Sequence, residues 1–124
     1  MKKENIINQE KMKIAVSSTG KDIEDEVDSR FGRCPYFLVV EAKKDEGISD
    51  VKVIENTTSE QMGGAGITAG QIISNEKPDA VITVNIGPKA LQVLGKFGIE
   101  IYFAKGNIRQ AVEDLIEGKL EKVS

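Results

Sequence analysis

The stretch GGAGITAG at residues 63–70 places four glycines within eight residues, where two differently patterned parts of the chain meet. Strand-like patterns precede it, and strand and helix patterns alternate after it. Glycine permits a positive φ, and a glycine run that opens a helix directs unpaired backbone N–H groups forward. The stretch therefore predicts a loop facing an anion or a cofactor; the alternative is a flexible hinge before a glycine-rich helix. It fits neither the P-loop nor the dinucleotide-binding pattern, which gives nucleotide binding by those motifs little support.

The sequence that follows the glycines predicts a helix, a strand and a second helix. The first helix covers residues 66–76, and Pro78 stops it because proline disfavours helix in the residue before it. The apolar run at 80–84 is typical of a strand buried on both faces. The second helix begins at Gly87-Pro88, since proline fits the first helical position. Its predicted apolar side comprises Ala90, Leu91, Leu94 and Phe97.

A strand at 100–104 and a third helix complete the pattern; Asn107 caps that helix and Gly118 ends it. The part before the glycines contains three predicted strands, at residues 13–18, 36–42 and 51–55. The charged segment 21–30 has no clean period and is expected to be a loop. We expect residues 1–11 to form a flexible tail and residues 12–124 to form a single domain.

The predicted element order is therefore βββαβαβα, an α/β fold with a mixed sheet of five strands and three helices. Short turns join the first three strands, which are expected to be antiparallel neighbours. Right-handed crossovers then place the fourth and fifth strands parallel to the first. The resulting order across the sheet is third, second, first, fourth, fifth.

This topology brings the glycine-rich and polar segments to one edge of the sheet. Open α/β sheets bind ligands outside the carboxyl ends of their strands, where the winding reverses, which is here between the first and fourth strands. Arg33 could fix an anionic group, and the two helix starts offer backbone donors. The candidate cofactor-binding residues are Ser17, Ser18, Gly20, Arg33, Cys34, Gly63, Gly64, Gly66, Asn85 and Gly87.

Cys34 is the single cysteine, and the chain contains no histidine. One cysteine excludes an internal disulfide, and the lack of histidine removes the commonest general base and metal ligand. Cys34 is a candidate metal ligand if nearby Arg33 favours its thiolate. The alternative for a lone cysteine before a proline is an inert, partly buried thiol.

The composition limits the partners and the location. The chain has 124 residues, a formal net charge of -3 and no dense basic stretch, which argues against nucleic acid as a partner. No apolar run approaches the roughly 18 residues that a membrane span needs. Residues 1–11 contain no apolar signal core, so a cytoplasmic protein is expected, as a monomer or weak homodimer.

Five motifs, in this order, resemble the dinitrogenase iron-molybdenum cofactor biosynthesis family, which includes NifX- and NafY-type proteins and the C-terminal domain of NifB. They are MKIAVS at 12–17, SRFGRCPYF at 29–37, GGAG at 63–66, GPKAL at 87–91 and GIEIY at 98–102. The resemblance spans residues 12 to about 120. It implies a ribonuclease H-like fold and a protein that carries an iron–sulfur cofactor or iron-molybdenum cofactor precursor, together with cofactor-assembly proteins as partners.

The leading functional hypothesis is accordingly a non-enzymatic carrier of an anionic metal–sulfur cofactor, held by backbone N–H groups, Arg33 and one thiolate. A ligand-free interaction or regulatory module of the same fold is the alternative. A metal-dependent nuclease would need clustered carboxylates at the centre of the sheet. The predicted strands at 13–18 and 80–84 contain no Asp or Glu, which argues against that third reading.

Overall fold

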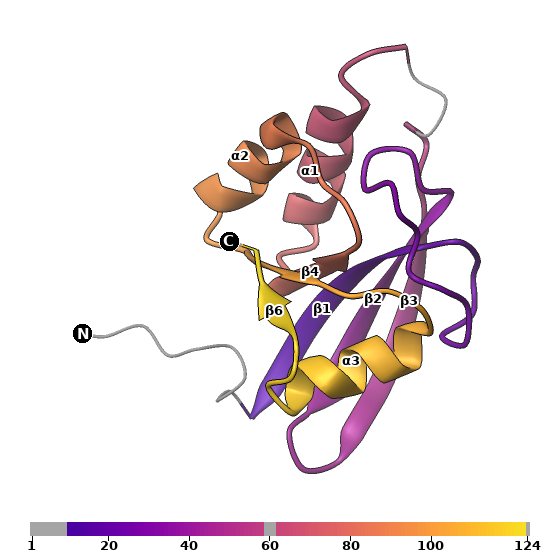
Figure 1. Ribbon diagram of the computed structural model, residues 1–124, viewed down its shortest axis with the longest axis vertical. Helices are drawn as coiled ribbons and strands as arrows, with labels where there is room; N and C mark the ends of the chain where they lie inside the picture. Colours follow the sequence, from indigo (N-terminus) through magenta and orange to yellow (C-terminus); the bar gives the residue numbers. More distant parts are fainter. Residues whose placement is uncertain (1–9, 59–61, 124) are drawn as a thin grey trace.

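The computed structural model describes residues 10–58 and 62–123 (Figure 1). Residues 1–9, 59–61 and 124 lie outside this description, and with them most of the predicted tail and part of the polar segment that precedes the glycines. The elements in chain order are β1 (Lys11–Ser18), β2 (Tyr36–Lys43), β3 (Gly47–Glu55), α1 (Ala65–Asn75), β4 (Ala80–Thr83), α2 (Pro88–Lys96), β5 (Glu100–Phe103), α3 (Ile108–Ile116) and β6 (Glu121–Lys122).

The sheet has the order β3-β2-β1-β4-β5-β6, which confirms the predicted arrangement of the first five strands. β1 pairs antiparallel with β2 and parallel with β4, and β4 pairs parallel with β5. The expected number of five strands is wrong, because Glu121 and Lys122 add a short sixth strand antiparallel to β5. Two charged residues carry no periodic signal, so the sequence pattern could not reveal this strand.

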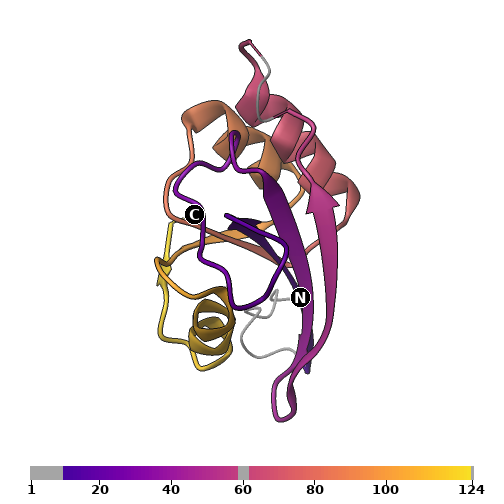
Figure 2. The same cartoon turned by 90° about the vertical axis from the view of Figure 1, so that its right-hand side faces the viewer.

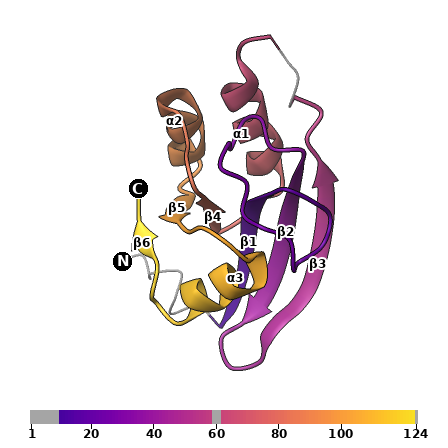
Figure 3. The ribbon, with the colours of Figure 1, turned by 45° about the vertical axis from the view of Figure 1, so that its right-hand side comes forward.

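Apolar side chains on the two faces of the sheet form two separate cores. Along β1, Ile14 and Val16 pack in the core beneath α3, whereas Ala15 between them packs in the core beneath α1 and α2. This alternation is the period of two expected of a strand whose two faces are both covered. Figures 2 and 3 show the resulting three layers, with α1 and α2 side by side on one face and α3 on the other.

The helix ends follow the predicted capping residues closely. The Asn107 side chain accepts a hydrogen bond from the backbone N–H of Gln110 at 2.8 Å, which caps α3 as expected. α2 begins at Pro88 and is followed by Gly98 at φ 70°. Phe97 departs from the prediction: it is the residue after the last turn of α2, and 64% of its surface is exposed. In the part of the chain that is described, no helix has the length and apolar character needed to cross a membrane.

Replacing the cap of α3 tests this account of the fold. Asn107→Ala removes the acceptor for the Gln110 N–H and the two contacts of the Asn107 amide with Glu24. We expect the variant to fold with a free energy of unfolding lower by about 1–2 kcal/mol, measured by urea denaturation. Gln110→Ala keeps the capped N–H and serves as the matched control. Equal stability of Asn107→Ala and wild type would contradict the assigned cap.

Candidate functional site

Five segments meet at one edge of the sheet, as the sequence predicts. Ser18 at the end of β1 pairs with Tyr36 at the start of β2, and Tyr36 pairs with Glu55 at the end of β3. Because β4 and β5 run parallel to β1, the segments that follow them leave the sheet at this same edge. Both α1 and α2 therefore begin here, after β3 and after β4.

A groove of about 290 Å³ lies between the first turns of α1 and α2, and we call it the N-terminal groove. Three of its residues belong to the predicted site, Gly64, Gly66 and Gly87. Ile67, Pro88 and Ala90 give it an apolar lining, and Lys89 adds a cation. The groove therefore combines positive charge, exposed backbone and an apolar surface.

The two helix starts that flank the groove lack the side-chain groups that would compete with an anion. Gly64 precedes α1 and Gly87 precedes α2, and neither provides a side-chain cap. The first turn of each helix also contains no acidic residue. The first N–H groups of a helix have no partner within the helix, and the helix dipole adds partial positive charge there. Two uncapped starts beside one groove thus favour a negatively charged occupant.

The backbone geometry explains the glycine at position 64. Its φ of 69° lies in the left-handed region, which glycine adopts without steric cost. Gly63 is also left-handed, with φ 93°, and a side chain there would meet no other atom within 4 Å. Gly32 is a glycine for another reason, close packing: a Cβ there would lie 2.9 Å from the backbone nitrogen of Gly66.

Hydrogen bonds of Asn56 connect the segment around Cys34 to the end of β3. Its amide donates to the carbonyl oxygens of Cys34 at 2.8 Å and of Gly32 at 3.2 Å, and its side-chain oxygen accepts from the hydroxyl of Thr58. Asn56 and Thr58 are both buried. Sequence reasoning missed Gly32 and Asn56 as structural supports of the site. An asparagine directly after a strand was the available signal.

Ser17, Ser18 and Gly20 lie at the predicted edge but do not line the groove. The buried Ser17 hydroxyl donates to the Asp28 carbonyl and lies 2.9 Å from the Thr83 hydroxyl. The Ser18 hydroxyl bonds to the backbone of Gly20. These side chains connect β1 to its loop and to β4. Arg33 and Asn85 are exposed at the edge, and the Asn85 carbonyl accepts from the Phe31 N–H at 3.3 Å.

Cys34 is packed in the core rather than displayed at the edge. None of its surface is exposed, and its thiol donates to the Phe31 carbonyl at 3.4 Å. Burial raises the pKa of the Cys34 thiol from 9.0 to about 12, which disfavours the thiolate. Ligation by Cys34 stays a prediction, and it would require the segment between Phe31 and Tyr36 to open.

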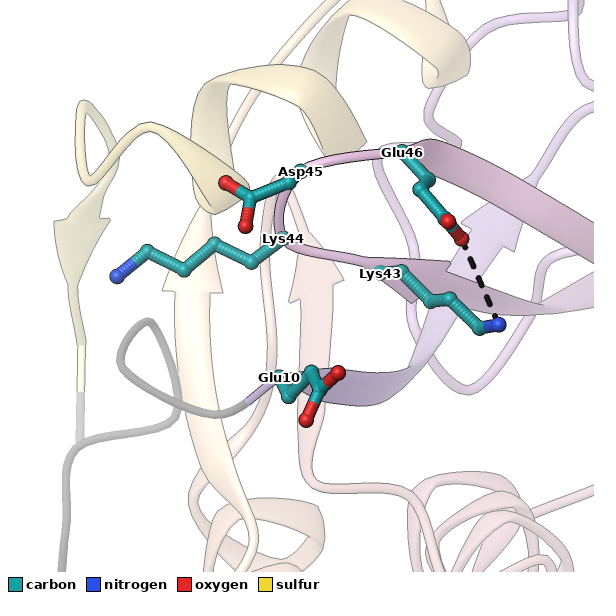
Figure 4. A pocket seen from close by; sticks show the side chains of 5 residues that line it. All are labelled: Glu10, Lys43, Lys44, Asp45 and Glu46. Carbon is teal, nitrogen blue, oxygen red and sulfur yellow. Dashed lines mark ion pairs between the residues drawn. The ribbon is translucent and has the colours of Figure 1, made fainter.

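A hollow at the opposite edge of the sheet has a different character (Figure 4). It lies at the turn between β2 and β3, where Lys43 and Glu46 form an ion pair of 3.5 Å. All of its lining residues are charged, with more acidic than basic side chains: Glu10, Lys43, Lys44, Asp45 and Glu46. This mixed charge does not favour an anion, and no glycine-rich segment reaches it.

Comparison with known proteins identifies the class. The model of the dinitrogenase iron-molybdenum cofactor family matches residues 12–118, and the chain belongs to this family. Two Methanocaldococcus jannaschii proteins are similar in sequence. Uncharacterized protein MJ0580 is 42% identical over 93 residues, covering 74% of this chain and 78% of the relative. Uncharacterized protein MJ0327 is 32% identical over 114 residues, covering 91% and 95%.

The fold is also similar to that of a solved protein. The apo form of the orange protein from Desulfovibrio gigas superposes with a TM-score of 0.80 and 29% identity. The match covers 91% of this chain and 93% of that chain. The family expected from the five sequence motifs is therefore confirmed, and the six-stranded mixed sheet with three helices has a solved counterpart.

The burial of Cys34 predicts how slowly its thiol reacts. Raising the pKa from 9.0 to about 12 lowers the thiolate fraction near pH 8 by about a thousandfold. Iodoacetamide should therefore label the native protein far more slowly than the protein unfolded in guanidinium, as followed by mass spectrometry. Labelling should speed up as the pH rises, because the thiolate forms only at high pH. Comparable rates in the native and unfolded protein would contradict the buried placement.

Proposed function

We propose that this protein is a non-enzymatic carrier of an anionic metal–sulfur cofactor or its precursor, bound in the N-terminal groove. The observation that carries the proposal is the pair of uncapped, acid-free helix starts on either side of that groove. The chain's membership of the iron-molybdenum cofactor family supports the metal–sulfur character of the cargo. The cargo is therefore an iron–sulfur cluster or an iron-molybdenum cofactor precursor.

The residues around the groove fit a cofactor that brings its own sulfide ligands. Within residues 10–58 and 62–123, no group of three or more Cys, Asp or Glu side chains is placed to hold a metal ion. A cluster that needs several protein thiolates does not match this donor set. A preassembled anion can instead be held by backbone N–H groups, by Lys89 and by Arg33, which follows the Gly32 that packs on the first turn of α1. Non-covalent holding also suits a carrier, because no metal–protein bond has to break on transfer.

The apolar part of the groove favours a soft, weakly hydrated anion over phosphate. Ile67, Pro88 and Ala90 line the groove next to the backbone donors. Phosphate and sulfate lose strong hydration when they contact apolar surface, whereas a sulfide-covered anion loses less. Affinity for a thiometalate and weak affinity for phosphate together define the proposed specificity.

The alternative functions lack a comparable supporting observation. Neither β1 nor β4 contains Asp or Glu, and the described residues provide no carboxylate cluster for two-metal hydrolysis. A ligand-free regulatory module would not need two open helix starts beside one groove. We also propose cofactor-assembly proteins as partners, and the ribonuclease H-like label for the fold on the basis of its strand order.

Obstructing the groove at Gly87 tests the proposal. Gly87 has an extended backbone, with φ -76° and ψ 163°, and a Cβ there would meet no other atom within 4 Å. Gly87→Val therefore adds a side chain beside the groove without backbone strain, at a cost of about 1 kcal/mol or less. We expect it to weaken tetrathiomolybdate binding at least about tenfold, as measured by equilibrium dialysis with molybdenum analysis.

Gly95→Ala is the matched control, since Gly95 is exposed on α2 and a Cβ there also meets open space. This control should bind tetrathiomolybdate as wild type does. Cys34→Ser should also leave binding unchanged if backbone groups hold the anion, whereas a strong loss would assign Cys34 as a ligand. Equal binding by Gly87→Val and wild type, or equal affinity for phosphate, would refute the proposed groove.

A further inference from the structure

A second groove lies at the other end of α1 and α2, and the proposed cofactor site does not use it. It has a volume of about 340 Å³ and is lined by Ser74, Lys77, Pro78, Phe97 and Ile99; we call it the C-terminal groove. Because the eleven residues of α1 rise about 1.5 Å each, roughly 16 Å separate it from the N-terminal groove. Figure 1 shows α1 and α2 side by side, so both grooves lie in the same helical layer.

Lys77 occupies a backbone position that the chain otherwise gives to glycine. The residue after the helix cap has a positive φ in all three helices: Lys77 (55°) after α1, Gly98 (70°) after α2 and Gly118 (74°) after α3. Glycine adopts this conformation freely, whereas lysine does so at a cost. After α2, the backbone N–H of Ile99 donates to the Leu94 carbonyl. Pro78 holds the corresponding position after α1, and it has no N–H to donate. The C-terminal end of α1 is thus less favourable than the glycine-containing ends of α2 and α3.

Ser74 adds a second feature that folding does not explain. Only 6% of this residue is exposed, and its hydroxyl has no hydrogen-bond partner in the part of the chain that is described. A buried hydroxyl without a partner destabilises the folded state, and such groups are rare in proteins. The residue lines the groove, but its hydroxyl oxygen is buried, so an occupant reaches it only when the Ser74 side chain rotates toward the groove.

Phe97 gives the C-terminal groove an exposed aromatic wall. Its side chain is 64% exposed, whereas Ile99 beside it is 6% exposed. A large aromatic side chain in water contributes little to folding but much to an interface that covers it. Three neighbouring residues therefore each depart from what stability alone would select.

We propose that the C-terminal groove binds an apolar side chain flanked by a carboxylate, presented by a partner protein. The only charged residue among those that line the groove is the cation Lys77, which favours a negatively charged partner segment. After rotation toward the groove, the unpaired Ser74 hydroxyl can donate to a carbonyl or carboxylate oxygen of that segment. Because Phe97 is mostly exposed, a free small molecule would be covered on one face only. A protein segment continues beyond the groove and can cover both its own side chain and Phe97.

The direct test is a titration of the ¹⁵N-labelled full chain with two capped peptides, acetyl-Glu-Leu-Phe-Glu-amide and acetyl-Lys-Leu-Phe-Lys-amide. At low salt, we expect the acidic peptide to shift the amide signals of Lys77, Gly98 and Ile99. Its affinity should exceed that of the basic peptide about fivefold, because one exposed charge contributes modestly. Phe97→Ser should remove these shifts while leaving the melting temperature near that of wild type.

Two further variants separate binding from a purely structural role. Lys77→Gly should raise the melting temperature by about 3 °C, because it relieves the backbone cost, and should abolish the preference for the acidic peptide. Ser74→Ala should also not lower the melting temperature, because the hydroxyl it removes has no partner. Lys44→Gln, at the turn between β2 and β3, is the charge-matched control and should keep that preference.

Each contrary result overturns the proposal in a defined way. Equal affinity for the two peptides would remove the role of Lys77 in selecting the partner. Shifts confined to residues of the N-terminal groove would place the binding elsewhere. A lower melting temperature of Lys77→Gly would make Lys77 a structural cap, and phenylbutyrate binding as tightly as the acidic peptide would replace the protein partner by a small carboxylate.

Discussion

The parallel pairing of β1 with β4 determines which ends of the helices meet. Through the register Ile14↔Ala80, Ala15↔Val81 and Val16↔Ile82, β4 leaves the sheet at the same edge as β1. The antiparallel hairpin of β2 and β3 returns the chain to that edge before α1. Both helices of one layer consequently start beside each other, and their N-terminal partial charges add at one place. The proposed anion site is thus a consequence of the sheet order.

The segment around Gly32 positions the start of α1 at this edge of the sheet. The backbone of Gly32 packs directly on the first turn of α1, where even a methyl group would come within 2.9 Å of the Gly66 nitrogen. Asn56 holds the same segment by its bonds to the carbonyls of Gly32 and Cys34. The motif that contains Cys34 thus serves, in this structure, to position α1. A buried thiol with a raised pKa is consistent with such a packing role.

Patterns of period and capping predicted the elements and their order, because these depend on residues close in sequence. The start of α1 after two left-handed glycines, the Asn107 cap and the strand order all follow from such local signals. The features that the sequence did not predict lack such a local signal. Gly32 and Asn56 act through contacts with residues at least 22 positions away. The strand β6 is too short to carry a pattern. Phe97 fits the helix period, although it lies just beyond the last turn of α2. Of the ten predicted site residues, Gly64, Gly66 and Gly87 line the groove, whereas the buried Ser17, Ser18 and Cys34 could not be told from exposed residues by sequence.

We propose that the uncapped helix starts of α1 and α2, rather than protein thiolates, hold the metal–sulfur anion. The most direct measurement is a crystal structure of the full chain with tetrathiomolybdate, using the anomalous signal of molybdenum to locate the anion. We expect a single strong peak in the N-terminal groove, within hydrogen-bond reach of the first backbone N–H groups of α1 and α2. A peak at Cys34 with the segment between Phe31 and Tyr36 displaced, or no peak at this edge, would contradict the claim.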